Sequence, residues 1–136
     1  YKINEKLRDK QQLTPKEDSF VRYLDAALSK TKVYKGEVNR PLSFMYDEDI
    51  DKYINMHKAG LPVRYNQYIS TTTDLMYNED GQVQMHISSR YGKDIRQYNG
   101  NENEILFERD AVFMVKKILE KDGIWDIWLE EKKHGK

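Results

Sequence analysis

The spacing of the hydrophobic residues changes close to Leu61, and this change limits the fold more than any other feature of the sequence. Before it, apolar residues recur at the three- and four-residue intervals of a helix, in a stripe that includes Val21, Leu24 and Leu28. After it, apolar and polar residues alternate, most clearly between residues 83 and 87. Helices followed by strands that short turns connect predict an α+β domain with a mostly antiparallel sheet.

Local signals place the individual elements. Residues 1–13 are polar, and the first clear helix signal is a capping box, with Thr14 as N-cap, Pro15 at the first helical position and Glu17 three residues after the cap. This helix is expected to run to Leu28, and a second one over residues 47–58. Residues 74–81 are expected to form a loop or a short helical turn, and residues 91–101 a loop. Strands are expected at 33–40 (one strand, or two that break at Gly36), 67–73, 83–87, 105–107, 111–118 and 124–129.

Composition narrows the range of functions. The 136 residues suit one domain, and the 23 basic and 23 acidic residues give a net charge of zero, so bulk charge indicates neither a nucleic-acid nor a membrane partner. No cysteine is present, which excludes disulfides, thiolate catalysis and cysteine metal sites. No apolar run approaches the ~20 residues that span a bilayer. The chain starts with Tyr rather than Met, so we expect it to be a fragment of a longer protein.

Three polar motifs could carry chemistry, although each also has an ordinary structural interpretation. Arg40, followed by Pro41, ends a strand, where an Arg is most often solvated; its rigid fork can also clamp a phosphate. The hydroxyls of residues 70–73 often just pair within a sheet, but Ser70 and Thr72 would point to the same side of a strand and could line a cleft together.

The third motif is a pair of acids, Glu102 and Glu104, directly before the apolar run 105–107. A solvated strand end would tolerate both acids, and strand geometry places them on the same side of the chain. Paired carboxylates in such a place are also a recurrent arrangement for stabilising a sugar oxocarbenium ion while a proton is handled.

Metal chemistry is not indicated. His57, His86 and His134 are scattered and match no ligand spacing, so we expect no metal site. Gly92-Lys93 does not make a phosphate loop either, because the glycine-rich lead and the following Ser or Thr are absent.

Taken together and in this order, the motifs resemble those of the bacterial mono-ADP-ribosyltransferase toxins, in the branch with an Arg, a Ser-Thr-Ser strand and a Glu-x-Glu pair. The resemblance extends over nearly the whole chain, and the segments that carry it are 32–40, 68–74, 83–87, 92–95 and 102–107. It implies two packed, mainly antiparallel sheets around a NAD cleft, with helices at the flank. It also implies that residues 1–136 form a single domain, the C-terminal toxin fragment of a longer protein.

The resemblance assigns roles to the motif residues. Arg40 would hold the NAD phosphate or the adjoining ribose, Ser70 would position Glu104 and the nicotinamide ribose, and Thr71 and Thr72 would shape their strand. Glu104 would stabilise the oxocarbenium ion as nicotinamide leaves. The remaining roles fall to Glu102, which would orient or deprotonate the acceptor, to Tyr98 as a target contact, and to Tyr77 as the aromatic over nicotinamide.

The activity implied is transfer of ADP-ribose from NAD to an arginine of a target protein, with NAD as substrate and without a metal. Arg90, Lys93 and Arg96, interleaved with Tyr91 and Tyr98, leave a second interpretation open, the same chemistry on RNA. A third is a non-catalytic binding domain on the same fold. The resemblance also implies that the protein is secreted or delivered into a target cell and acts in its cytoplasm. It further implies that an immunity protein blocks the active site in the producing cell.

Overall fold

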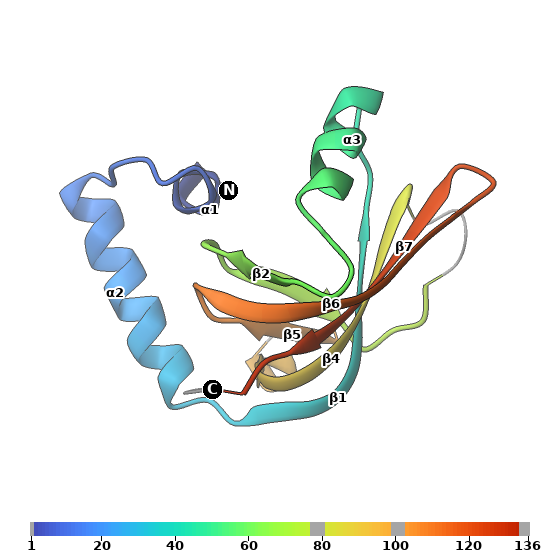
Figure 1. Cartoon of the computed structure of the whole chain (residues 1–136). Coiled ribbons are helices and arrows are strands. Elements are labelled where there is room, and N and C mark those ends of the chain that lie inside the picture. Colours follow the sequence, from blue (N-terminus) through green and yellow to red (C-terminus); the bar gives the residue numbers. More distant parts are fainter. Residues whose placement is uncertain (1, 77–80, 99–102, 134–136) are drawn as a thin grey trace.

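The computed structural model of the chain describes residues 2–76, 81–98 and 103–133. The described helices are α1 (Lys2–Arg8), α2 (Pro15–Ser29) and α3 (Asp47–Asn55), and Arg96–Tyr98 form a short 3₁₀ turn, η2. The strands in chain order are β1 (Val33–Leu42), β2 (Pro62–Tyr65), β3 (Ile69–Thr72), β4 (Val83–Asp94), β5 (Glu104–Phe107), β6 (Ala111–Lys121) and β7 (Ile124–Glu131). Figure 1 shows α1 and α2 standing together beside the sheet and α3 projecting away from it.

The strand pairings confirm an α+β domain with mainly antiparallel strands. The seven described strands belong to one hydrogen-bonded sheet, in which β1, β4, β7, β6 and β2 are successive neighbours and form the larger layer. Among the described strands only the β4–β7 pair is parallel. β3 and β5 pair with each other and form a smaller second layer. The two layers are joined by hydrogen bonds, because the end of β4 pairs with β5 and Asn39 of β1 pairs with Thr72 of β3.

The core lies where the two layers pack. Phe107 of β5 meets Phe113 of β6 edge to face, with ring centroids 5.1 Å apart, and both side chains are fully buried. Ile69 and Ile105 belong to the same cluster, so β3 and β5 each turn one face to the core and leave the other face free for a site.

Gly92 permits the close crossing of β4 over β5. A Cβ on this residue would lie 2.7 Å from the Ser89 Oγ, 2.8 Å from the Ile105 Cγ2 and 3.1 Å from a ring carbon of Phe107. Two of these three contacts are with side chains of the buried core, which cannot shift freely.

We therefore expect Gly92→Ala to destabilise the fold by about 1–3 kcal/mol through overpacking. Denaturant unfolding would measure the loss, with Ser88→Ala on the same strand as control. Equal stability of the Gly92→Ala protein and the wild type would show that β5 has room to move away from β4.

Helix α2 forms as its sequence predicts and is attached to the sheet at two places. The capping box is present, with the Glu17 N–H donating to the Thr14 Oγ1 (3.2 Å) and the Thr14 N–H to the Glu17 Oε1 (2.9 Å). Asp25 accepts hydrogen bonds from Tyr68 (2.6 Å) and Arg109 (2.5 Å).

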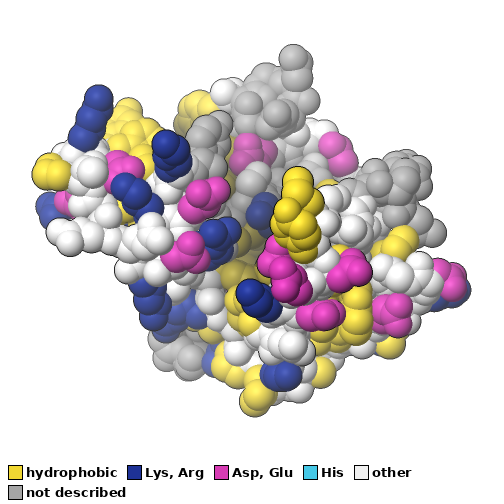
Figure 2. Space-filling model, turned by 90° about the horizontal axis from the view of Figure 1, so that it is seen from above, with side chains coloured by type: hydrophobic (Ala, Val, Ile, Leu, Met, Phe, Trp, Pro, Cys, Tyr) yellow, Lys and Arg dark blue, Asp and Glu magenta, His cyan; other side chains and the backbone are white. Residues whose placement is uncertain are grey.

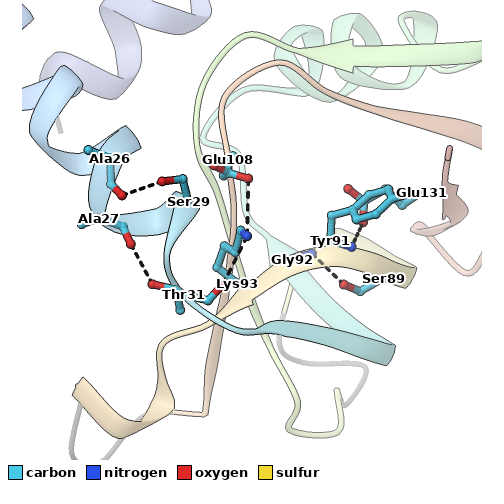
Figure 3. A network of polar contacts seen from close by, with 10 residues as sticks. All are labelled: Ala26, Ala27, Ser29, Thr31, Ser89, Tyr91, Gly92, Lys93, Glu108 and Glu131. Atoms are coloured by element: carbon cyan, nitrogen blue, oxygen red, sulfur yellow. Dashed lines mark hydrogen bonds and ion pairs between the residues drawn. The ribbon is translucent and has the colours of Figure 1, made fainter. Parts of the chain in front are cut away.

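The second attachment of α2 is close to its C-terminal end. Lys93 of β4 donates its ammonium to the Thr31 carbonyl (3.3 Å) and lies 3.9 Å from the Glu108 carboxylate (Figure 3). These ties fix the helix as a wall beside β3 and β5.

The structure corrects several boundaries. Residues 91–94 continue β4 rather than opening a loop, because they pair with β1 and β5. Pro41 stays inside β1, opposite Gln84; the other edge of β1 pairs with β3 only at Asn39, so the missing N–H is tolerated. α3 ends at Asn55 rather than Lys58. α1, which the polar N-terminal sequence did not indicate, is held by Asn4.

His57 and His86 both contact other side chains of the fold, and His134 lies outside the described residues. His57 is buried, with its Nδ1 2.7 Å from the Tyr53 carbonyl and its Nε2 2.5 Å from the Tyr65 hydroxyl, and burial lowers its pKa. His86 pairs with Asp126 at 2.7 Å and stacks on Trp128. The described residues contain no group of three or more His, Asp or Glu side chains suited to hold a metal ion. None of the described helices has the length and apolar character needed to cross a membrane.

Candidate active site

Three of the residues singled out from the sequence converge on one groove. Arg40 reaches it from β1, Ser70 from β3 and Glu104 from β5, although they are far apart in the chain. The polar end of the groove is a cleft of about 270 Å³, and its lining residues are Asn39, Arg40, Pro41, Ser70, Thr71, Thr72, Asp74, Asn103 and Glu104.

Arg40 forms one wall of the groove. Its Nη1 donates to the Ser70 carbonyl (2.7 Å), which ties β1 to β3, and its Nε is buried without an acceptor in the described part of the chain. The charge of the Arg40 guanidinium also affects Tyr53. Burial raises the pKa of Tyr53 to about 12, and the positive charge of Arg40 opposes that rise. Arg40 is therefore a partly buried cation with unused donor capacity, a suitable partner for an anion.

Ser70 and Glu104 are linked directly across the two strands. The Ser70 Oγ donates to the Glu104 Oε2 at 2.6 Å. Their strands pair antiparallel with Thr72 opposite Glu104, so the two side chains are diagonal neighbours on the same face. The short charge-assisted hydrogen bond holds the carboxylate in a fixed direction, partly shielded from solvent.

The threonines of the hydroxyl strand have separate positions. Thr71 is buried and donates its hydroxyl to the Ile105 carbonyl (2.7 Å), which holds β3 to β5. Thr72 is half-buried, and its Oγ1 accepts from the Asp74 N–H (3.0 Å). Both residues border the polar cleft.

The groove continues into an apolar part of about 400 Å³ towards the N-terminal helices. This part shares Arg40, Ser70 and Glu104 with the polar cleft, and its other lining residues are Ile3, Asn4, Phe20, Leu24, Tyr68 and Leu106. Figure 2 looks down on this side of the molecule, where the surface is hollowed between the N-terminal helices and α3. A groove with a polar and an apolar half matches a ligand that joins charged phosphates to flat rings.

Sequence reasoning did not find the contribution of the N-terminal helices to the groove. Phe20 and Leu24 belong to the apolar stripe of α2, but a stripe alone does not distinguish a groove wall from a core face. Ile3 and Asn4 lie in α1, a helix that the polar N-terminal residues did not indicate. The Asn4 side chain forms two hydrogen bonds with the backbone of Tyr68, donating to its carbonyl (3.0 Å) and accepting from its N–H (2.9 Å).

The remaining predicted residues lie elsewhere or outside the described residues. Tyr98 is 72% exposed on η2 and does not line the groove. Tyr77 and Glu102 are outside the described residues. Among the described residues before Glu102, Arg96 binds Asp94 at 2.7 Å, and this hydrogen bond lowers the Asp94 pKa to about 2.

The basic strip expected from Arg90, Lys93 and Arg96 does not form as a free cationic surface. Lys93 is only 8% exposed and its ammonium is used by Thr31 and Glu108. Arg96 is paired with Asp94, and the Nε of Arg90 donates to the Glu131 carbonyl (3.1 Å).

Comparison with known proteins supports the sequence resemblance. No protein-family model matches the chain. A curated relative, the NAD(+)--protein-arginine ADP-ribosyltransferase Tre1 of Pseudomonas putida (strain GB-1), is 28% identical over 131 residues, which cover 95% of this chain. The match covers 26% of Tre1, so the chain spans about a quarter of the length of this relative.

Solved structures confirm the fold. The type III effector XopAI of Xanthomonas axonopodis pv. citri superimposes with a TM-score of 0.79 at 18% identity, covering 98% of this chain and 58% of that one. Exoenzyme S of Pseudomonas aeruginosa, bound to carba-NAD and human 14-3-3 protein beta, gives 0.77 at 21% identity, covering 99% and 68%. The ADP-ribosyltransferase Vis, a toxin of Vibrio splendidus, gives 0.68 at 20% identity in its complex with agmatine, covering 88% and 59%. The likeness to bacterial ADP-ribosyltransferase toxins is thus confirmed, and the chain has their fold.

Proposed function

We propose that this chain, which has the fold of the bacterial ADP-ribosyltransferases, transfers ADP-ribose from NAD to an arginine of a target protein and releases nicotinamide. The observation that carries the proposal is the convergence of Arg40, Ser70 and Glu104 in one groove, with Ser70 holding the Glu104 carboxylate at 2.6 Å. The name of Tre1 as a protein-arginine ADP-ribosyltransferase supports arginine as acceptor. Vis, whose structure contains agmatine, a guanidinium compound, supports it too.

The first half of the proposed reaction breaks the bond between nicotinamide and ribose. Nicotinamide leaves as a neutral molecule, so the chain needs no general acid for it; positive charge instead develops on the ribose. The Glu104 carboxylate, fixed by Ser70 in the partly shielded groove, stabilises that charge. Arg40 holds the phosphates at the polar end, and the apolar half of the groove takes a flat ring.

The second half requires a nucleophile. A guanidinium has a pKa above about 12, so it attacks only as it loses a proton. In this proposal Glu102 attracts the target arginine and accepts that proton. Glu102 is separated from Glu104 by one residue in sequence, which is what a shared site for the ribose cation and the acceptor requires.

A direct experiment tests the class of reaction. The purified protein is incubated with NAD labelled in the adenylate part, with and without agmatine, and nicotinamide release and labelled agmatine are both measured. We expect slow release of nicotinamide alone and faster release with agmatine. A protein that binds NAD and leaves it intact would instead support a non-catalytic binding domain.

Arg40 gives a prediction about substrate binding. Arg40→Ala is expected to raise the Kd for NAD by about tenfold or more, because a bidentate phosphate contact is lost. The free energy of unfolding should fall by only about 1 kcal/mol, the size of one hydrogen bond such as that to the Ser70 carbonyl.

Calorimetric titration with NAD and denaturant unfolding give the two values for Arg40→Ala. Arg40→Lys is the matched variant, which keeps the charge without the fork and should bind NAD with intermediate affinity. Unchanged affinity in the alanine variant would remove Arg40 from the site.

An RNA acceptor remains the second candidate, although the pairing of Lys93 and Arg96 within the protein does not favour it. Labelled NAD added to a bacterial lysate separates the two, because label in the protein fraction supports the arginine acceptor and label in RNA supports the alternative. We further propose that residues 1–136 are one catalytic domain at the C-terminus of a longer secreted or delivered toxin. It would act in the recipient cytoplasm, and an immunity protein would cover this groove in the producing cell.

A further inference from the structure

Asn39, Asp74 and Asn103 form a polar clamp at the end of the groove next to Glu104. The Asn39 Nδ2 donates to the Asp74 carbonyl (2.7 Å), and the Asn103 Nδ2 donates to the Asp74 Oδ1 (2.7 Å). Two backbone N–H groups add hydrogen bonds at the same place. The Thr73 N–H donates to the Asn103 carbonyl (3.0 Å), and the Asp74 N–H donates to the Thr72 hydroxyl (3.0 Å). Asp74 is therefore the centre that the other residues contact.

The clamp joins the three segments that carry the groove residues. In the sequence, Asn39 directly precedes Arg40 and Asn103 directly precedes Glu104. Asp74 comes four residues after Ser70. All three clamp residues border the polar cleft. The strand pairing of β3 and β5 ends at Thr72 and Glu104. Beyond those residues the backbone hydrogen bond from Thr73 to Asn103 and the side chains of the clamp together hold the two segments.

The exposure of the clamp indicates that it contributes little to global stability. Asp74 and Asn103 are exposed, and Asn39 is half-buried. Exposed hydrogen bonds of this kind add little to a fold whose core lies between the layers. The charge-assisted hydrogen bond between Asn103 and Asp74 does fix a direction, however. It holds Asn103, which directly precedes Glu104 in the chain.

We infer that Asp74 is a positioning residue: through Asn103 it fixes where β5 begins and so the direction in which Glu104 presents its carboxylate. Ser70 holds that carboxylate from one side and the clamp holds its backbone from the other. Stabilisation of a developing cation depends steeply on placement, and an error of about 1 Å can cost a hundredfold in rate. The inference rests on the proposed function.

The hydrogen-bonded side chains of Asp74 and Asn103 can be exchanged, which allows a test by reversal. Asn103→Asp sets two carboxylates against each other and should push the segments apart. Asp74→Asn leaves an amide oxygen that can still accept from Asn103 and should be mild. The double variant Asn103→Asp/Asp74→Asn restores an amide–carboxylate pair in the opposite sense, with the net charge of the wild type. Gln11→Glu, on the exposed link between α1 and α2, adds one carboxylate away from the clamp and controls for charge.

The measurements are kcat and KM for nicotinamide release from NAD, together with Tm. We expect Asn103→Asp to lower kcat by about tenfold, the effect of losing one charge-assisted contact, with KM within about twofold and an unchanged Tm. The reversed pair should recover to within about threefold of the wild type, because it remakes that contact. The kcat of Asp74→Asn should lie between those of Asn103→Asp and the reversed pair, and the kcat of Gln11→Glu should equal that of the wild type.

An Asn103→Asp protein with the kcat of the wild type would overturn the inference, and so would a reversed pair no more active than Asn103→Asp. A fall in Tm that accounts for the loss of activity would also do so, since the clamp would then serve the fold rather than the carboxylate. A wild-type protein that releases no nicotinamide is a different outcome, because it removes the proposed function and this inference with it.

Discussion

Replacing Glu104 by Gln is expected to lower the rate of nicotinamide release by about 10²–10³-fold, the range found when a preorganised group that stabilises transition-state charge is removed. The amide has nearly the shape of the carboxylate and can still accept from Ser70, so the fold should persist. What is lost is the negative charge opposite the ribose. Nicotinamide release from NAD without any target measures the effect, and Tm shows whether the protein remains folded.

Glu130→Gln is the matched control for this change. Glu130 is an exposed carboxylate on β7 that lines neither part of the groove. It should keep the activity of the wild type. A Glu104→Gln protein that releases nicotinamide as fast as the wild type would show that the groove residues do not perform the chemistry.

Replacing Glu102 by Ala is expected to separate the two halves of the reaction. Transfer to agmatine or protein arginine should fall by about 10²-fold or more, because the guanidinium loses the group that accepts its proton. Nicotinamide release without an acceptor should stay within a few-fold of the wild type, because Glu104 still faces the ribose. The ratio of labelled agmatine to released nicotinamide measures the separation directly.

Glu102→Gln distinguishes two parts of this role. The amide can still bind a guanidinium by a hydrogen bond but cannot take its proton, so transfer should remain low while acceptor binding is partly kept. Equal loss of transfer and hydrolysis in the alanine variant would contradict the separate roles given to Glu102 and Glu104.

Parts of the fold could be predicted because their causes are local. The capping box at Thr14 and the apolar stripe after it define α2 without help from other segments, and the structure contains both. Strands were expected at 111–118 and 124–129, and β6 and β7 are indeed joined by a tight turn at Asp122 and Gly123. Both residues have the positive φ angles that such a turn requires.

Other parts depend on partners that no local pattern shows. Residues 91–94 read as a loop because they are rich in polar residues and Gly, yet β1 and β5 hold them in β4. α1 is short and polar, and it is held in place where Asn4 meets the Tyr68 backbone, 64 residues away. Helices of this length are not stable alone, so only contacts with the rest of the chain decide whether they form.

The site divides in the same way. The order of Arg40, the hydroxyl strand and the two acids follows from the sequence, and it was sufficient to name the fold and three residues that meet in the groove. The apolar wall from α1 and α2 and the clamp around Asp74 were not visible, since both depend on side chains that approach from distant segments.

The sequence by itself determined which chemical groups this protein has and the period of each segment, because residue identity sets charge, hydrogen-bonding capacity and helix or strand preference within a few residues. Only the tertiary structure decided that a guanidinium, a hydroxyl and a carboxylate share one groove, and in which direction the carboxylate points. Those properties arise from strand pairing and packing between β1, β3 and β5, and contacts over such separations are set by the energy of the whole fold.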